Sequence, residues 1–122
     1  MADAIPRVVE IYETEDGESP FQDWLKSIRG SQAHGKVLAR LKNVERGNFG
    51  DFHYLDDGVS ELRFMTRSGP RVYYGEDRIR NENTGDEQLR VMVLWGGLKG
   101  SQQRDIETAK KFWRDHNAKA GS

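Results

Sequence analysis

The residues best suited to chemistry are cations in the second half of the chain. Arg63 and Arg71 stand in two short stretches, 61–65 and 71–74, whose alternating hydrophobic residues predict β-strands. Because alternate side chains of a strand point to opposite faces, Arg63, Arg71 and Tyr73 are expected together on one exposed face of a sheet. Arginine binds the oxygens of a phosphate through paired hydrogen bonds, and a tyrosine ring can stack on a base or transfer a proton. The pattern favours a phosphodiester as the ligand.

Two more cations follow the last predicted strand, at residues 89–95. Lys99 leaves the end of this strand, and Arg104 lies about one turn into the helix behind it. If the strand end and the helix start converge, Lys99 and Arg104 join the arginines at one phosphate site. The same pattern also fits arginines that only form ion pairs on a solvated face, with Glu61, Glu76 or Asp77 as partners.

Other chemistries have less support. The chain contains no cysteine, which excludes disulfides and thiolate metal sites, and its three histidines (His34, His53 and His116) are not at metal-ligand spacing. We therefore expect neither a metal nor a cofactor. The glycine-rich segment 96–101 lacks the spacing of a phosphate-binding loop, and no nucleophilic serine motif is present.

Length and charge limit the remaining functions. The chain has 122 residues, which predicts a single domain over 1–122, and its net charge of −1 gives no general support to nucleic-acid binding. Residues 26–46 are nevertheless basic, and Lys36, Arg40 and Lys42 could contact RNA or simply form a solvated helix face. No segment resembles a signal peptide or a membrane span, so a cytoplasmic protein is expected.

The elements that must position these residues follow from hydrophobic periodicity. Residues 7–14, 61–65, 71–74 and 89–95 predict strands, and residues 19–30, 31–46 and 101 onward predict helices. The polar segment 75–88 predicts a long hairpin loop, and the ends 1–6 and 117–122 are expected to be flexible. The order β-α-α-β-β-β-α indicates an α+β fold: an antiparallel sheet packed with an N-terminal helical hairpin and a C-terminal helix.

Several motifs together resemble a known family of toxins. They are Phe21-x-x-Trp24-Leu25, Gly47–Asp51, Glu61-Leu62-Arg63, Arg71-Val72-Tyr73-Tyr74 and the segment from Leu94 through Gly96-Gly97-Leu98-Lys99 to Ile106. In this order they resemble the HigB-like addiction-module killer proteins of the RelE/ParE superfamily, over roughly residues 8 to 113. The chain departs from that pattern in its net charge, in Leu98 and in the polar segment 75–88.

The resemblance implies a RelE-like fold and the toxin of a type II toxin–antitoxin system. It further implies a metal-independent endoribonuclease that cleaves mRNA on the ribosome and is neutralised by a cognate helix-turn-helix antitoxin. By position, Arg63, Arg71 and Lys99 correspond to the phosphate-contacting cations of such toxins, and Gln103 and Arg104 flank the site. A ParE-like gyrase-binding toxin and a non-catalytic antitoxin-binding corepressor remain alternatives on the same scaffold.

Overall fold

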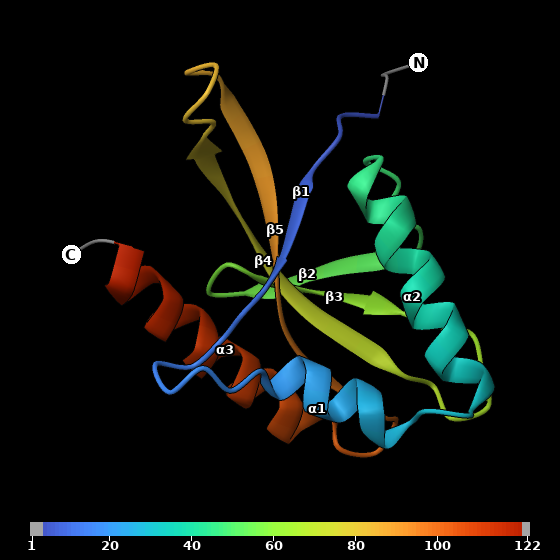
Figure 1. The fold of residues 1–122 in the computed structure, drawn as a ribbon. Helices are drawn as coiled ribbons and strands as arrows, with labels where there is room; N and C mark the ends of the chain where they lie inside the picture. The colour runs from blue at the N-terminus through green and yellow to red at the C-terminus, as the bar shows by residue number, and fades with distance from the viewer. Residues whose placement is uncertain (1–3, 121–122) are drawn as a thin grey trace.

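A five-stranded sheet carries three helices in the part of the chain that the structure, a computed structural model, describes, residues 4–120 (Figure 1). The strands are β1 (Val8–Ile11), β2 (Phe52–Asp56), β3 (Val59–Arg63), β4 (Arg71–Arg80) and β5 (Glu87–Gly97). The helices are α1 (Pro20–Ser27), α2 (Gln32–Glu45) and α3 (Gln102–Ala120). The α+β class predicted from the sequence is confirmed.

The sheet is mixed, so the prediction of an antiparallel sheet is wrong. Its strand order is β1-β5-β4-β3-β2, and β1 runs parallel to β5, with Val8 opposite Arg90 and Ile11 opposite Val93. The other neighbours are antiparallel. Hydrophobic alternation does not encode the direction of a strand, which is decided by where α1 and α2 return the chain to the sheet.

One strand, β2, was not predicted, and the observed order is β-α-α-β-β-β-β-α. A tight turn at Asp57 and Gly58, with positive φ angles of 53° and 83°, joins β2 to β3. An Asp-Gly pair between alternating residues is a recognised hairpin signal. The strand itself has little hydrophobic alternation, because β2 is a short and mostly exposed edge strand.

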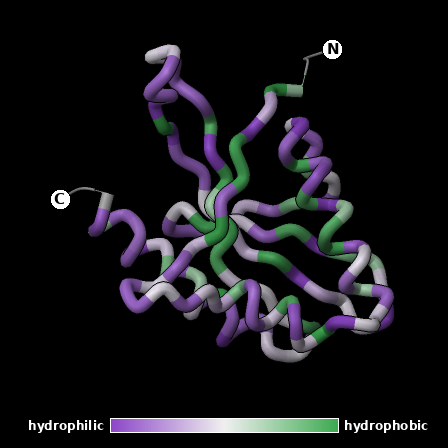
Figure 2. Tube along the Cα trace, in the orientation of Figure 1, coloured by the Kyte–Doolittle hydropathy of each residue, from purple (hydrophilic) through white to green (hydrophobic). Residues whose placement is uncertain are grey.

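The hairpin of β4 and β5 is longer than predicted. Most of the expected loop 75–88 is strand, and only residues 81–86 form the turn, where Asn81 N–H donates to the Asp86 carbonyl at 2.8 Å. The polar residues belong to strands that extend beyond the helices, and Figure 2 shows that the outer end of this hairpin is mostly hydrophilic. Cross-strand ion pairs such as Arg90–Asp77, at 2.7 Å, replace apolar contacts there.

Serine caps begin the first two helices where the sequence predicts them. The Ser19 hydroxyl accepts from the Gln22 N–H at 3.4 Å, and the Ser31 hydroxyl accepts from the His34 N–H at 3.3 Å. The two helices diverge from their connection instead of lying side by side as a hairpin (Figure 1), because α1 packs on β5 whereas α2 packs on β1. Helix α3 continues through residues 117–120, which were expected to be flexible. Residues 4–6 form no regular element, and residues 1–3 and 121–122 lie outside the described part.

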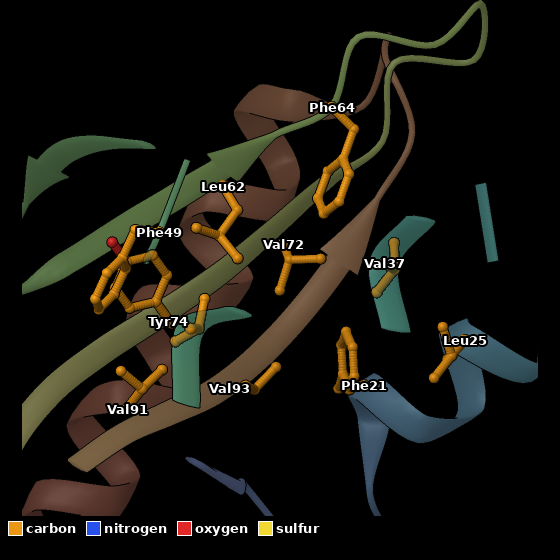
Figure 3. Packing of buried hydrophobic residues seen from close by; sticks show 11 residues of the cluster. Phe21, Leu25, Val37, Phe49, Leu62, Phe64, Val72, Tyr74, Val91 and Val93 are labelled. Atoms are coloured by element: carbon orange, nitrogen blue, oxygen red, sulfur yellow. The ribbon is translucent and has the colours of Figure 1, made fainter. Parts of the chain in front are cut away.

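Hydrophobic residues cover both faces of the sheet. On one face Leu62, Phe64, Val72 and Tyr74 pack beneath α1 and α2, as the alternation predicts (Figure 3). On the other face Ala109 and Trp113 of α3 pack on a cluster of Tyr12, Val59, Tyr73, Met92 and Leu94. Strand β5 contributes to both clusters and is therefore covered on both faces. In α2, Leu38 lies outside the covered face of the helix, since 43% of it is exposed.

Two consecutive glycines let helices approach both faces of β5. A Cβ atom at Gly96 would lie 2.2 Å from the Trp24 ring of α1, and one at Gly97 would lie 1.9 Å from the Asp105 carboxylate of α3. Asp105 accepts hydrogen bonds there from Trp95 Nε1 at 2.9 Å and from the Ser101 hydroxyl. The Gly96-Gly97 motif is therefore required by the packing of α1 and α3.

Substituting Gly75 with alanine should destabilise the protein, because the new Cβ would lie 2.6 Å from the Trp113 ring. Overpacking of this kind costs about 1–3 kcal/mol of unfolding free energy. Gly35→Ala is the matched control, because a Cβ there meets nothing within 4 Å and the residue lies in α2; it should stabilise by about 0.5–1 kcal/mol. Urea denaturation measures both, and equal effects of the two changes would contradict the packing of Trp113 on β4.

Candidate functional site

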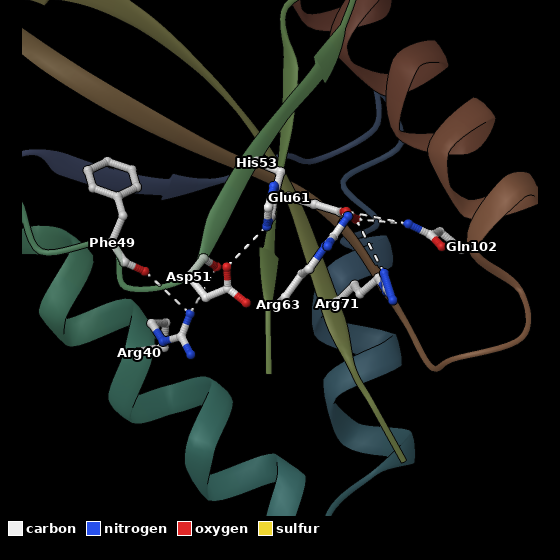
Figure 4. Close-up of polar contacts among 8 residues, drawn as sticks. All are labelled: Arg40, Phe49, Asp51, His53, Glu61, Arg63, Arg71 and Gln102. Carbon is white, nitrogen blue, oxygen red and sulfur yellow. Dashed lines mark hydrogen bonds and ion pairs between the residues drawn. The ribbon is translucent and has the colours of Figure 1, made fainter. Parts of the chain in front are cut away.

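A buried carboxylate gathers two of the predicted site arginines. Glu61 of β3 is 0% exposed. Arg63 Nε donates to Glu61 Oε1 at 2.9 Å, and Arg71 Nη1 lies 3.8 Å from Glu61 Oε2. From the start of α3 the Gln102 amide donates to the same carboxylate, at 3.3 and 3.4 Å (Figure 4). We call Glu61, Arg63, Arg71 and Gln102 the Glu61 cluster.

Strand register explains why these residues meet. Arg63 lies directly opposite Arg71 in the β3–β4 pair, and Glu61 is two residues before Arg63 on the same face. The segment after β5 then returns over this face and begins α3 at Gln102. The sequence prediction that Arg63 and Arg71 share a face is confirmed. Their pairing with Glu61 is also observed, but the carboxylate is buried and does not lie on a solvated face, as the alternative to a phosphate site had it.

The cluster keeps capacity to bind an anion. One carboxylate faces two guanidinium groups, which leaves one formal positive charge unbalanced. Arg71 is partly buried, with 19% of its side chain exposed, and its Nε and Nη1 atoms have no hydrogen-bond partner in the described structure. Arg63 is more open, at 38%. Buried N–H groups without a partner are uncommon and are often completed by a ligand or an ion.

Tyr73 does not lie on an exposed face, so this part of the prediction is wrong. It is fully buried, because α3 covers the face that was expected to be free. Burial raises the pKa of the Tyr73 hydroxyl, and the nearby Glu61 and Asp105 raise it further, against the lowering effect of Arg71 and Arg63. The phenol therefore stays protonated. Because the ring is buried, it cannot stack on a base.

The remaining cations around α3 lie at the rim. Lys99 is exposed, and its backbone N–H donates to the Ser68 carbonyl at 3.1 Å, which places it beside the turn that leads into Arg71. Gln103 and Arg104 are exposed on the first turn of α3, next to Gln102. The structure thus brings Lys99 near the strand ends of the cluster and leaves Gln103 and Arg104 free to face a partner.

The basic residues of α2 differ in their exposure. Lys36 and Lys42 are exposed, as an RNA-contacting surface requires. Arg40 is instead packed into the structure: its guanidinium lies 4.4 Å from the centre of the Phe64 ring and donates to the Phe49 carbonyl at 3.3 Å. Burial lowers the pKa of Arg40, and Asp51 opposes this. We therefore assign Arg40 a structural role.

Sequence reasoning had not placed the Asp51–His53 pair of the β2 edge. His53 lies directly opposite Glu61 in the β2–β3 register, and its Nε2 lies 3.1 Å from Asp51 Oδ1. Figure 4 shows the imidazole beside Glu61 and Arg63. The Asp-Gly turn of this hairpin is the sequence signal from which the position of His53 near the cluster could have been predicted. The third histidine, His116, belongs to a separate network with Asp77 and Arg90.

The described residues set limits on other kinds of site. Within residues 4–120, no three histidine, aspartate or glutamate side chains are grouped so as to hold a metal ion. None of the described helices is both long and apolar enough to cross a membrane.

Comparison with known proteins identifies a relative in Haemophilus influenzae. It is an uncharacterized protein that is 38% identical over 90 residues, which are 74% of this chain and 82% of the relative. No family model matches the chain. No solved structure matches it either. At this identity and coverage, the chain belongs to the same family as the H. influenzae protein.

Proposed function

We propose that this protein is the toxin of a type II toxin–antitoxin system, a metal-independent endoribonuclease with a RelE-like fold. In this proposal it acts in the cytoplasm, cleaves mRNA on the ribosome and is neutralised by a cognate helix-turn-helix antitoxin. The motif resemblance to HigB-like proteins supports the class of protein. The Glu61 cluster supports cleavage of a phosphodiester, and this part of the proposal rests on one observation.

That observation is the position of Arg63 directly opposite Arg71, with Nε and Nη1 of Arg71 lacking a hydrogen-bond partner. Like charges directly opposite each other on neighbouring strands are unfavourable, and a buried donor without a partner costs about 1–3 kcal/mol. Such local conflicts are typical of functional sites, where an absent ligand completes the arrangement. A phosphodiester anion would satisfy both the free donors and the unbalanced charge.

The reaction needs no metal. The 2′-OH attacks the adjacent phosphorus, the bond from phosphorus to the 5′ oxygen breaks, and the products are a 2′,3′-cyclic phosphate and a free 5′-OH. Arg63 and Arg71 stabilise the charge that develops on the non-bridging oxygens, a contribution of about 3–4 kcal/mol for each well-placed donor.

Two protons must move in this step. His53, oriented by its contact with Asp51, takes the proton of the 2′-OH, and Lys99 gives a proton to the leaving 5′ oxygen. Glu61 and Gln102 act as positioning residues, because they hold the arginines and do not touch the phosphate. Four exposed residues would contact ribosomal RNA around the site: Lys36, Lys42, Gln103 and Arg104.

Brief induction of the protein in bacteria without its antitoxin should arrest growth and produce sharp in-frame cuts in translated mRNA. Mapping of mRNA 5′ ends is the measurement. Arg71→Lys is the matched control, since it retains the charge but loses the planar fork, and it should produce no cuts while accumulating as folded protein. DNA damage signals without mRNA cuts would contradict this function and favour a gyrase-binding toxin. Normal growth with abundant folded protein would contradict any toxin.

His53→Gln should lower the cleavage rate of ribosome-bound mRNA by about 10²–10⁴-fold, because glutamine cannot accept and release the proton. Single-turnover cleavage of purified complexes measures the rate separately from binding. His34→Gln on α2 is the control and should cleave like the wild type. A His53→Gln variant with the wild-type rate would remove this residue from the mechanism and leave the role of the arginines intact.

A further inference from the structure

A second candidate site lies on the face of the sheet opposite to Glu61. There a hollow of about 340 Å³ opens between the end of α2 and strands β2 and β4. Its lining residues are Arg7, Gly47, Phe49, Phe52, Tyr74 and Glu76. Phe52 is opposite Leu62 in the register, and Leu62 belongs to the cluster beneath α1 and α2, which places the hollow on that face. The proposed nuclease mechanism uses none of these residues.

Aromatic rings form the apolar walls of the hollow. The Phe49 ring centre lies 5.6 Å from those of both Phe52 and Tyr74, and Figure 3 shows Phe49 and Tyr74 together at one end of the core cluster. Phe49 and Tyr74 are buried, whereas Phe52 is 54% exposed and stands at the mouth. Burial raises the pKa of Tyr74 to about 12, so this wall is a neutral phenol. An exposed aromatic ring beside a hollow favours a flat ligand that can stack.

A polar pair completes the lining. Arg7 Nε lies 3.7 Å from Glu76 Oε1, too far for a hydrogen bond, and this buried Nε has no other partner in the described structure. The arginine is held in place: its backbone N–H donates to the Glu45 carbonyl at 2.9 Å, and its guanidinium lies 5.0 Å from the centre of the Phe49 ring. The hollow therefore presents a fixed donor next to a carboxylate acceptor.

We propose that this hollow binds a guanine base. Guanine is flat, and along one edge it offers the N–H donors of N2 and N1, in that order, followed by the O6 acceptor. The two oxygens of Glu76 accept the donors as a pair, Arg7 donates to O6, and Phe52 stacks on the ring. Each of the other bases places an acceptor where Glu76 requires a donor: N1 of adenine, N3 of cytosine, and a carbonyl beside the single N–H of uracil. The pair therefore selects guanine by repulsion as well as by attraction.

This inference does not depend on nuclease activity, so it is tested by binding alone. Titration of the ¹⁵N-labelled full chain with GMP should shift the backbone amide signals of Arg7, Phe49, Phe52 and Glu76. AMP, CMP and UMP should bind at least about ten-fold more weakly, because a bidentate contact discriminates by roughly this factor or more. No shifts with millimolar GMP, or shifts confined to Arg63, Arg71 and Gln102, would overturn the proposal; the latter would mean that only the phosphate is bound.

Two variants probe the contacts. Glu76→Gln should weaken GMP binding by about ten-fold or more, since the carboxamide turns a donor toward the base, and Phe52→Ala should weaken it by a similar factor through lost stacking. The matched controls are Glu87→Gln, an exposed carboxylate of β5, and Tyr54→Ala, an exposed ring of β2; both should bind like the wild type. Equal losses in the variants and their controls would overturn the assignment.

A second ligand distinguishes a guanine in single-stranded RNA from a free guanine nucleotide. The pentanucleotide UUGUU should shift the same amides as GMP if the hollow reads a guanine in single-stranded RNA, and UUUUU should not. If GMP binds and UUGUU does not, the ligand is a free guanine nucleotide. If UUGUU and UUUUU bind equally and Glu76→Gln affects neither, the hollow does not read guanine.

Discussion

The ion pairs of Glu61 are the interaction on which the candidate site depends. A carboxylate removed from water loses several kcal/mol of solvation, and it is stable only with compensating charge and hydrogen bonds. Arg63, Arg71 and Gln102 supply them from two strands and one helix. Each partner is thereby held in one position, which is the property a phosphate site needs. Because Glu61 sits between two arginines that would otherwise repel each other, it also makes their close approach possible.

Packing around β5 brings this cluster together. Gly97 leaves room for Asp105, Asp105 fixes the start of α3 through Ser101 and Trp95, and the first turn of α3 places Gln102 on Glu61. On the other face Gly96 leaves room for Trp24 of α1. Trp24, Gly96, Gly97 and Asp105 therefore have a structural role here, because they let two helices pack on one strand. In the proposed function the chemistry rests instead on Glu61, Arg63 and Arg71.

The sequence predicted what local periodicity determines. The starts of the first two helices, at Ser19 and Ser31, and the two arginines on one face follow from residue order, and the structure confirms them. Strand direction and the return of α3 over the sheet depend on distant contacts, so the parallel β1 and the burial of Tyr73 were not foreseen. The polar strands of the β4–β5 hairpin have the composition of a loop, because charged pairs there replace the apolar pattern. His53 was not placed in the cluster, because its position depends on the register of an unpredicted hairpin.

A double-mutant cycle on the stability of the protein tests the central claim most directly. Glu61→Gln and Arg71→Met are made singly and together, and the free energy of unfolding is measured by urea denaturation. If Glu61 and Arg71 stabilise each other, each single change leaves a buried charge undercompensated, and the double variant should lose less than the sum of the singles by about 1–3 kcal/mol. Losses that add to within about 0.5 kcal/mol would contradict the account, because two residues without mutual interaction behave in this way.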